Sequence, residues 1–183
     1  MRKQNFKYPD TKSYQFVLNY FHEKSITQHD LAQLAYDMTS EFTPDVSIDH
    51  CFHVIEDVMH KRDYLSTAMI MINLDQLAEK HELAEPLQSI VTADAGVFGV
   101  DEDLAMSIAT LYGPIGATNF GYLDRVKKGL IRHIDRDGSH INTFLDDLLG
   151  ATVAAACGKI SHEYAWFSRK KCSPCLKLTN NYT

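Results

Sequence analysis

The chain has 183 residues, of which 45% are hydrophobic and 23% charged, a size and composition typical of one globular domain with a substantial core. Its net charge of −6 argues against general affinity for nucleic acid, and the lack of a run of about 18 apolar residues excludes a membrane-spanning helix. The N-terminus has no apolar signal-peptide segment, and the four cysteines form no disulfide framework, so we expect a cytoplasmic protein.

Helix signals recur along the chain, whereas the period-two alternation typical of strands is nearly absent. In chain order, the pattern predicts helices over 11–23, 27–42, 48–62, 63–83, a short piece over 85–90, and then 100–112, 118–134 and 143–162. Thr27 and Ser47 are expected N-caps, and Gly129 is expected to interrupt the helix over 118–134. The sequence therefore predicts an all-α fold, a compact bundle of about six to seven helices.

The third predicted helix, over 48–62, contains a pattern that could be mistaken for a metal site. His50, His53, Asp57 and His60 would lie along one stripe of the helix, and such side chains can hold zinc. The apolar residues of this helix occupy the opposite face. An exposed polar face is therefore the favoured interpretation.

The last predicted helix, over 143–162, has only a narrow polar face. A helical wheel places small residues together with Asp146 and Asp147 on one side, and leaves only a narrow polar sector near Thr152 and Lys159. A helix with almost no polar face is expected at the centre of the bundle. Its small residues would let neighbouring helices, or a ligand, approach the backbone closely.

Basic residues predominate near the C-terminus, whereas the body of the chain carries the excess of acid. We expect one helical domain over 1–165 and a basic, disordered tail over 166–183. Cys172 and Cys175 form a single CxxC without a second pair at zinc-site spacing, so two incidental thiols are the favoured interpretation.

The adjacent acids Asp146 and Asp147 call for an explanation, because charges at the start of a buried helix are costly unless they are paired. Carboxylates in a first turn stabilise the helix dipole by ~0.3–1 kcal/mol, and capping alone would account for one acid. Two acids ahead of such an apolar helix favour a second interpretation, a site that holds a cation.

A second acidic cluster, Asp101-Glu102-Asp103, opens another nearly uncharged helix. If the two helix starts meet, four carboxylates would surround one site, an arrangement that like-charge repulsion disfavours unless cations are present. Oxygen ligands without a companion cysteine or histidine select a hard ion, and Mg²⁺ is the best match. The expected metal ligands are Asp101, Glu102, Asp146 and Asp147.

Asp124 precedes Lys127 and Lys128 at helical spacing, which allows two interpretations. The three residues could form a surface ion pair, or Asp124 could face the metal while a lysine binds an anionic substrate. The stretch over 135–146 resembles a calcium-binding loop, but its glycine stands at the wrong position, so we discount that site.

Carboxylates that hold Mg²⁺, together with a lysine, are the groups that phosphoryl chemistry requires. The metal neutralises phosphate oxygens and lowers the pKa of a bound water, which can then attack phosphorus. The chain contains no GxxxxGK[ST] motif, so a P-loop nucleotidase is disfavoured.

These motifs resemble those of the phosphatidylglycerophosphatase A family, in particular a soluble branch without transmembrane helices. Family members show an Asp-Glu pair that opens a helix, then Leu-Asp-x-x-Lys-Pro, then an Asp-Asp-x-x-Ala/Gly helix. Asp101-Glu102, Leu123-Asp124 with Lys127, and Asp146-Asp147 correspond to these motifs, and the similarity is strongest over 85–162.

The chain also departs from the family pattern. Lys128 stands where the motif usually has proline, and the N-terminal Gly-Thr-x-Gly-Ser segment and spanning helices of the membrane-bound members are missing. The first 85 residues look unrelated to those members.

The resemblance implies an all-helical bundle with a central helix, and Mg²⁺-dependent removal of the phosphate from phosphatidylglycerophosphate to give phosphatidylglycerol. The implied catalytic residues are Asp101, Glu102, Asp124, Asp146 and Asp147, and the implied substrate-binding residues are Lys127 and Lys128. Asp124 would be a further metal ligand or an orienting group, and any of the carboxylates could be the nucleophile or base.

Two alternatives remain open at this stage. One is a non-catalytic, metal-binding helical scaffold or regulator, and the other is a phosphatase of a small soluble phosphomonoester. The expected partners are accordingly a phospholipid headgroup or such a phosphomonoester, with peripheral membrane contact through the basic tail, and with homo-oligomers allowed.

Overall fold

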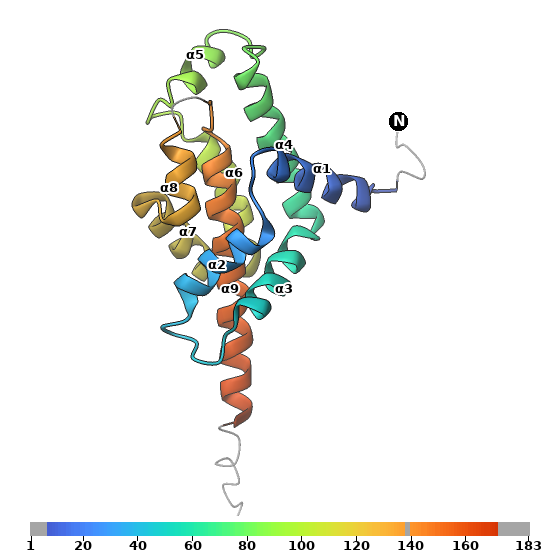
Figure 1. The fold of residues 1–183 in the computed structure, drawn as a ribbon, viewed down its shortest axis with the longest axis vertical. Coiled ribbons are helices and arrows are strands. Elements are labelled where there is room, and N and C mark those ends of the chain that lie inside the picture. Colours follow the sequence, from blue (N-terminus) through green and yellow to red (C-terminus); the bar gives the residue numbers. More distant parts are fainter. Residues whose placement is uncertain (1–6, 138–139, 172–183) are drawn as a thin grey trace, which may run out of the picture.

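The computed structural model describes residues 7–137 and 140–171, and all regular secondary structure in these ranges is helical, which confirms the all-α prediction. The helices are α1 (Asp10–Glu23), α2 (Gln28–Thr39), α3 (Ile48–Met59), α4 (Arg62–Glu79), α5 (Leu87–Thr92), α6 (Val100–Ala109), α7 (Pro114–Val126), α8 (Gly129–Asp135) and α9 (Leu145–Lys171). A short 3₁₀ turn, Thr110–Tyr112, joins α6 to α7. Figure 1 shows their arrangement as a bundle.

The described part of the chain contains more helices than predicted, because the helix expected over 118–134 is two helices. Lys127 ends α7 with a left-handed φ of 47°, and Gly129 also has a positive φ, of 55°. Two such residues so close together stop the helical hydrogen-bond pattern and turn the chain. α7 also begins earlier than expected, at Pro114, because the fixed φ of proline suits the first helical position.

The predicted N-caps are confirmed. The Thr27 hydroxyl accepts a hydrogen bond from the Asp30 amide at 3.2 Å, and the Asp30 carboxylate accepts one from the Thr27 amide at 2.8 Å. Ser47 caps α3 in the same way, through the His50 amide at 3.1 Å. Short polar side chains thus define these helix starts locally, as their sequence indicated.

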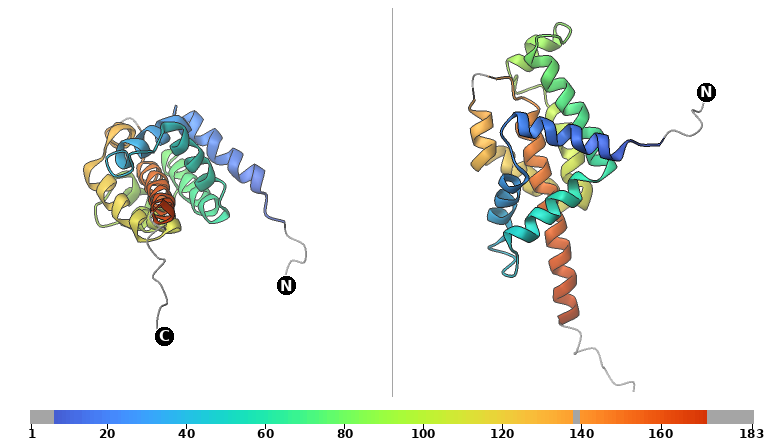
Figure 2. Two further views of the ribbon diagram at one scale, coloured as in Figure 1. Left: turned by 90° about the horizontal axis from the view of Figure 1, so that it is seen from below. Right: turned by 45° about the vertical axis from the view of Figure 1, so that its right-hand side comes forward.

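α9 is the central helix. Figure 2 shows it nearly end-on, with the other helices around it. From Asn142 to Ile160 every residue is buried except Lys159, and even the Thr152 hydroxyl is inside, where it donates to the Leu148 carbonyl at 2.7 Å. Lys159 reaches outward to pair with Asp57. The wheel prediction of a surrounded helix is therefore confirmed.

Small residues let α7 pack directly against the backbones of its neighbours. A Cβ on Gly116 of α7 would lie only 1.8 Å from the Ala109 carbonyl oxygen, and a Cβ on Gly158 of α9 would lie 3.4 Å from the Gly116 nitrogen. On the same side of α9, Gly150 faces the Phe120 ring of α7. This close approach brings the C-terminal end of α7 next to the first turn of α9.

The polar stripe of α3 lies on the surface, as predicted, with His50, His53 and His60 all exposed. At the other end of the chain, α9 continues to Lys171 and so extends into the segment expected to be a disordered tail. Cys172 and Cys175 lie outside the described residues. None of the helices that the structure describes combines the length and apolar character needed to cross a bilayer.

We predict that Gly116→Ala destabilises the protein by about 2 kcal/mol or more, because the added methyl meets backbone rather than a movable side chain. Gly121→Ala is the matched control in the same helix, since its Cβ would have no neighbour within 4 Å. That change should stabilise by about 0.5–1 kcal/mol. Urea unfolding measures both, and equal stability of the two variants would contradict the packing described above.

Candidate functional site

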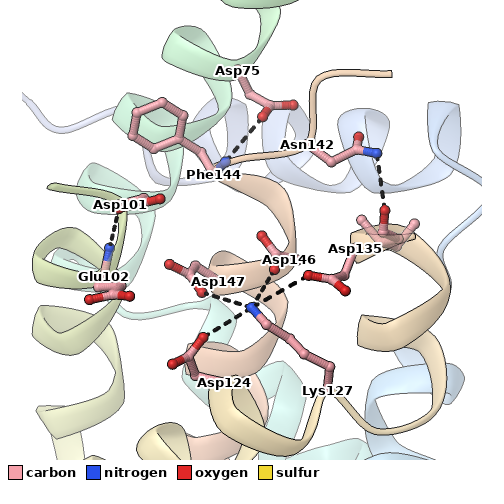
Figure 3. Close-up of polar contacts among 11 residues, drawn as sticks. Asp75, Asp101, Glu102, Asp124, Lys127, Asp135, Asn142, Phe144, Asp146 and Asp147 are labelled. Atoms are coloured by element: carbon pink, nitrogen blue, oxygen red, sulfur yellow. Dashed lines mark hydrogen bonds and ion pairs between the residues drawn. The ribbon is translucent and has the colours of Figure 1, made fainter. Parts of the chain in front are cut away.

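Four helix ends meet around a polar cavity of about 180 Å³. They are the N-terminal ends of α6 and α9 and the C-terminal ends of α7 and α8, which Figure 3 shows facing one another. The acidic residues lining the cavity are Asp94, Asp101, Glu102, Asp124, Asp135, Asp146 and Asp147, and Lys127 supplies a basic group. Residues far apart in the sequence thus form one strongly acidic site.

The ammonium of Lys127 lies among these carboxylates. Its Nζ is 2.6 Å from Asp146 Oδ2 and 3.0 Å from Asp124 Oδ1. Asp147 Oδ1 and Asp135 Oδ1 are farther, at 3.8 and 4.0 Å. The left-handed turn that ends α7 places Lys127 here. The same turn that separates α7 from α8 therefore also brings in the positive charge that neutralises part of the site.

The first turns of α9 and α6 supply the buried acids. Asp146 and Asp147 are the second and third residues of α9, with exposed fractions of 8% and 5%. Gly99, with a left-handed φ of 59°, precedes the first residue of α6, and Asp101 is the second residue of that helix. The Oδ1 of Asp101 accepts a hydrogen bond from the Glu102 amide at 3.0 Å. Both helix dipoles favour negative charge at these ends.

Burial and mutual repulsion raise the pKa values of these carboxyls. Desolvation raises the pKa of Asp146 to about 6, although Lys127 lowers it. The pKa of Asp147 rises to about 8, through desolvation first and then the Asp146 charge. Desolvation likewise raises the pKa of Asp101 and of Glu102. One lysine therefore does not balance the negative charge of the cluster.

Lys127 responds in the opposite direction. Burial alone would lower the pKa of its ammonium, but the adjacent Asp146 and Asp124 carboxylates outweigh burial and raise that pKa. The side chain is therefore firmly protonated at neutral pH. Such a cation can pair with carboxylates or with a phosphate group.

The structure brings together most of the residues predicted for the site. Asp101, Glu102, Asp124, Asp146, Asp147 and Lys127 all line the one cavity. Lys128 does not line it. Its Nζ lies 4.9 Å from the centre of the Tyr122 ring, because the turn after Lys127 sends the two neighbouring side chains in different directions.

Sequence reasoning missed Asp94, Asp135 and Thr143 at the cavity wall. Asp135 was discounted as part of a false calcium loop, yet the turn between α7 and α8 returns it to within 4.0 Å of Lys127. Asp94 lies in the loop before α6, at a left-handed φ of 44°. The acid-rich stretch at 135–146 was the one signal that pointed to Asp135.

The donor set fits a hard divalent cation, because its ligands are carboxylate oxygens and its negative charge exceeds that of Lys127. In the side-chain arrangement of the described residues, however, no group of three or more His, Cys, Asp or Glu is poised to hold a metal ion. Asp124 and Asp146 instead turn toward the Lys127 ammonium. A cation would therefore compete with Lys127 for the same oxygens.

Comparison with known proteins gives a match over most of the chain. The sequence profile of the phosphatidylglycerophosphatase A family matches residues 25–162. This range starts well before residue 85, so it includes α2, α3 and α4, in the N-terminal region that had looked unrelated. The match therefore covers every residue of the acidic cavity.

Three similar proteins match between 76% and 87% of this chain. The uncharacterized Bacillus subtilis (strain 168) protein YpjQ is 35% identical over 158 residues, 86% of this chain and 89% of YpjQ. YutG of the same strain is 39% identical over 141 residues, 76% of this chain and 85% of YutG. The crystal structure of YpjQ gives a TM-score of 0.82 at 34% identity, over 87% of this chain and 99% of that one. The low temperature requirement C protein of Listeria monocytogenes gives 0.79 at 39% identity, over 85% and 96%.

We predict that the metal-free protein loses stability as the pH rises from about 5.5 to about 8.5. The folded-state pKa values of Asp146 and Asp147 lie above 3.8, the ordinary pKa of an aspartate side chain, so the folded state holds protons that the unfolded state has already lost. That contribution is full at low pH and disappears as the pH passes through about 6 and about 8.

Urea unfolding in EDTA at several pH values measures this slope. Asp147→Asn should flatten it at the alkaline end, and added Mg²⁺ should stabilise the wild type most at high pH, where the carboxylates are ionised. A stability that increased from about pH 5.5 to about pH 8.5 would contradict the electrostatics of the site.

Proposed function

The chain belongs to the phosphatidylglycerophosphatase A family, and on this basis we propose that it is a Mg²⁺-dependent phosphatase that hydrolyses phosphatidylglycerophosphate to phosphatidylglycerol and phosphate. The observation that carries the proposal is the convergence of five acids with Lys127 in one cavity. The five are Asp101, Glu102, Asp124, Asp146 and Asp147. They come from three separate helices, and each matches a family motif.

In the proposed site, Asp101, Glu102, Asp146 and Asp147 hold Mg²⁺. When bound, this ion would neutralise phosphate oxygens and lower the pKa of a coordinated water. The raised pKa values of Asp146 and Asp147 support the assignment, because burial first, and neighbouring carboxylates second, disfavour the ionised forms that a bound cation would stabilise. Asp124 is either a further ligand or the group that orients Lys127, with which it pairs at 3.0 Å.

Lys127 contacts the substrate phosphate. Its ammonium already points into the cavity and pairs with carboxylates, and a phosphate dianion can take over those contacts at similar distances. When a cation takes the carboxylate oxygens, Lys127 is released to pair with the phosphate. The two charges that now share an ion pair would then each have a new partner.

The hydrolysis needs a group that accepts a proton near neutral pH. Water adds to phosphorus, the ester P–O bond breaks, and the proton lost by the water ends on the departing alcohol oxygen. One of the carboxylates that line the cavity, Asp101, Glu102, Asp124, Asp146 or Asp147, would carry that proton. One of them could instead attack phosphorus itself, in which case water would hydrolyse the resulting acyl phosphate.

The size of the cavity suggests which part of the substrate enters. At about 180 Å³ it is smaller than the ~300–1,000 Å³ pockets that enclose whole drug-sized ligands. A phosphate group fits such a volume, while the acyl chains of a phospholipid would stay outside. A lipid and a small phosphomonoester would present the same group, so the assay must compare both.

We predict Mg²⁺-dependent phosphate release from phosphatidylglycerophosphate in detergent micelles, and none above background in EDTA. Asp147→Asn should lower the rate by about 100-fold or more, because it removes a proposed ligand. Asp103→Asn is the matched control, an exposed acid in the same cluster that does not line the cavity, and should keep wild-type activity. Glycerol 3-phosphate tests the small-substrate alternative in parallel.

If glycerol 3-phosphate were the better substrate, the protein would be assigned as a phosphatase of small soluble phosphomonoesters and not of the lipid. No release from either substrate in any condition, or equal rates for wild type and Asp147→Asn, would contradict the proposed enzyme.

A further inference from the structure

Asp75 of α4 is a buried carboxylate that does not line the acidic cavity. Its exposed fraction is 1%, and its two oxygens have different partners. Oδ2 accepts a hydrogen bond from the Tyr20 hydroxyl of α1. Oδ1 accepts one from the backbone amide of Phe144 at 3.3 Å, a contact visible in Figure 3. Asp75 thus connects α1 and α4 to the residue that precedes α9.

One turn further along α4, Glu79 makes an equivalent contact at the other end of the same linker. It accepts a hydrogen bond from the Ile141 amide at 2.6 Å and pairs with His140 Nδ1 at 2.7 Å. Asp75 and Glu79 therefore hold both ends of residues 140–144, the described part of the link that leads into α9. We call this the α9 entry segment.

The middle of the α9 entry segment is fixed as well. Asn142 accepts a hydrogen bond from Lys24 Nζ at 3.3 Å, and its amide donates to the Ile134 carbonyl at 3.3 Å. The Thr143 hydroxyl donates to the Val91 carbonyl at 2.9 Å. A segment of irregular backbone is thus tied by side-chain contacts along its whole described length.

The position of Phe144 determines where the two acids point. Asp146 and Asp147 follow it by two and three residues in a continuous helix, where one residue of slippage turns every side chain by about 100°. The first amides of a helix also lack intrahelical partners, and a carboxylate is a favourable acceptor there. The contact with Asp75 gives the Phe144 amide a partner, and the same contact fixes the register of the first turn of α9.

A role limited to filling space does not suit Asp75. Burial disfavours its charged form and raises its pKa to about 6, against the hydrogen bond from Tyr20 and the field of Lys24, which lower it. An apolar side chain of the same size would avoid that desolvation. The carboxylate must therefore contribute through its directed contacts.

We propose that Asp75 is a positioning residue, which together with Tyr20 holds the α9 entry segment so that Asp146 and Asp147 face the cavity in the register that binds a divalent cation. This inference rests on the cation site of the proposed function but not on the hydrolysis step. It assigns a role in the site to α1 and α4, neither of which lines the cavity.

Two substitutions separate position from charge. Asp75→Asn keeps an oxygen for the Phe144 amide, and its NH₂ can donate to the Tyr20 oxygen, so both contacts survive without the charge. Asp75→Leu keeps the same branched arrangement of side-chain heavy atoms and loses both contacts. Thr152→Val is the control for general destabilisation, because it removes a buried hydroxyl of α9 that has no contact with the entry segment.

The experiment measures Mg²⁺ binding by calorimetry, amide hydrogen exchange of the metal-free protein, and kinetics as a function of Mg²⁺. We expect Asp75→Leu to weaken Mg²⁺ binding roughly 10-fold or more, the usual effect of losing a group that orients a metal ligand. Exchange should accelerate at Phe144 through Asp147, and kcat at saturating Mg²⁺ should change less than the Mg²⁺ requirement. Asp75→Asn and Thr152→Val should bind Mg²⁺ as the wild type does.

The outcomes separate this inference from the proposed activity. Equal Mg²⁺ affinity in Asp75→Leu and wild type, or equal weakening in Asp75→Asn and Asp75→Leu, would overturn the positioning role whatever the activity. A wild type that binds Mg²⁺ but releases no phosphate would overturn the proposed activity. The Mg²⁺ affinities of the Asp75 variants would still decide whether Asp75 is a positioning residue. A wild type that does not bind Mg²⁺ would overturn both.

Discussion

The burial of Asp146 and Asp147 at the start of the central helix is the constraint on which the site depends. Two adjacent carboxylates inside a bundle require compensating charge, and Lys127 supplies only part of it. Lys127 reaches them because α7 ends in a left-handed turn and because glycines let α7 approach α9 closely. The chain turn, the helix packing and the electrostatics are therefore one connected feature.

The rest of the bundle serves to hold this feature in place. Neighbouring helices bury α9 on all sides, and this packing fixes the direction of its axis. The contacts of Asp75 and Glu79 with the α9 entry segment fix the position at which α9 begins. Interiors packed this tightly are stiff, so the carboxylates cannot simply turn to solvent to relieve their repulsion. Two responses remain, protonation and cation binding, and the raised pKa of Asp147 reflects the first.

Much of the fold could be read from the sequence because its signals are local. Thr27 and Ser47 cap helices through neighbours three residues away, and the helical period of α9 shows that it is surrounded. The period does not say which helices surround it. Asp135 and Asp75 were missed because their roles arise from contacts between distant segments, and Lys128 was misplaced because a single left-handed residue separates its direction from that of Lys127. Pairs of acids at helix starts marked the centre of the site, but not its surroundings.

In the proposed site, a cation and protons compete for the same buried carboxylates. Calorimetry in buffers of different ionisation enthalpy measures this competition, because it counts the protons released when Mg²⁺ binds. Because the pKa of Asp147 is raised to about 8, binding at pH 7 should release about one proton per ion, and Asp147→Asn should abolish the release. Binding of Mg²⁺ to the wild type without proton release at pH 7 would show that the cation and protons do not compete for these carboxylates.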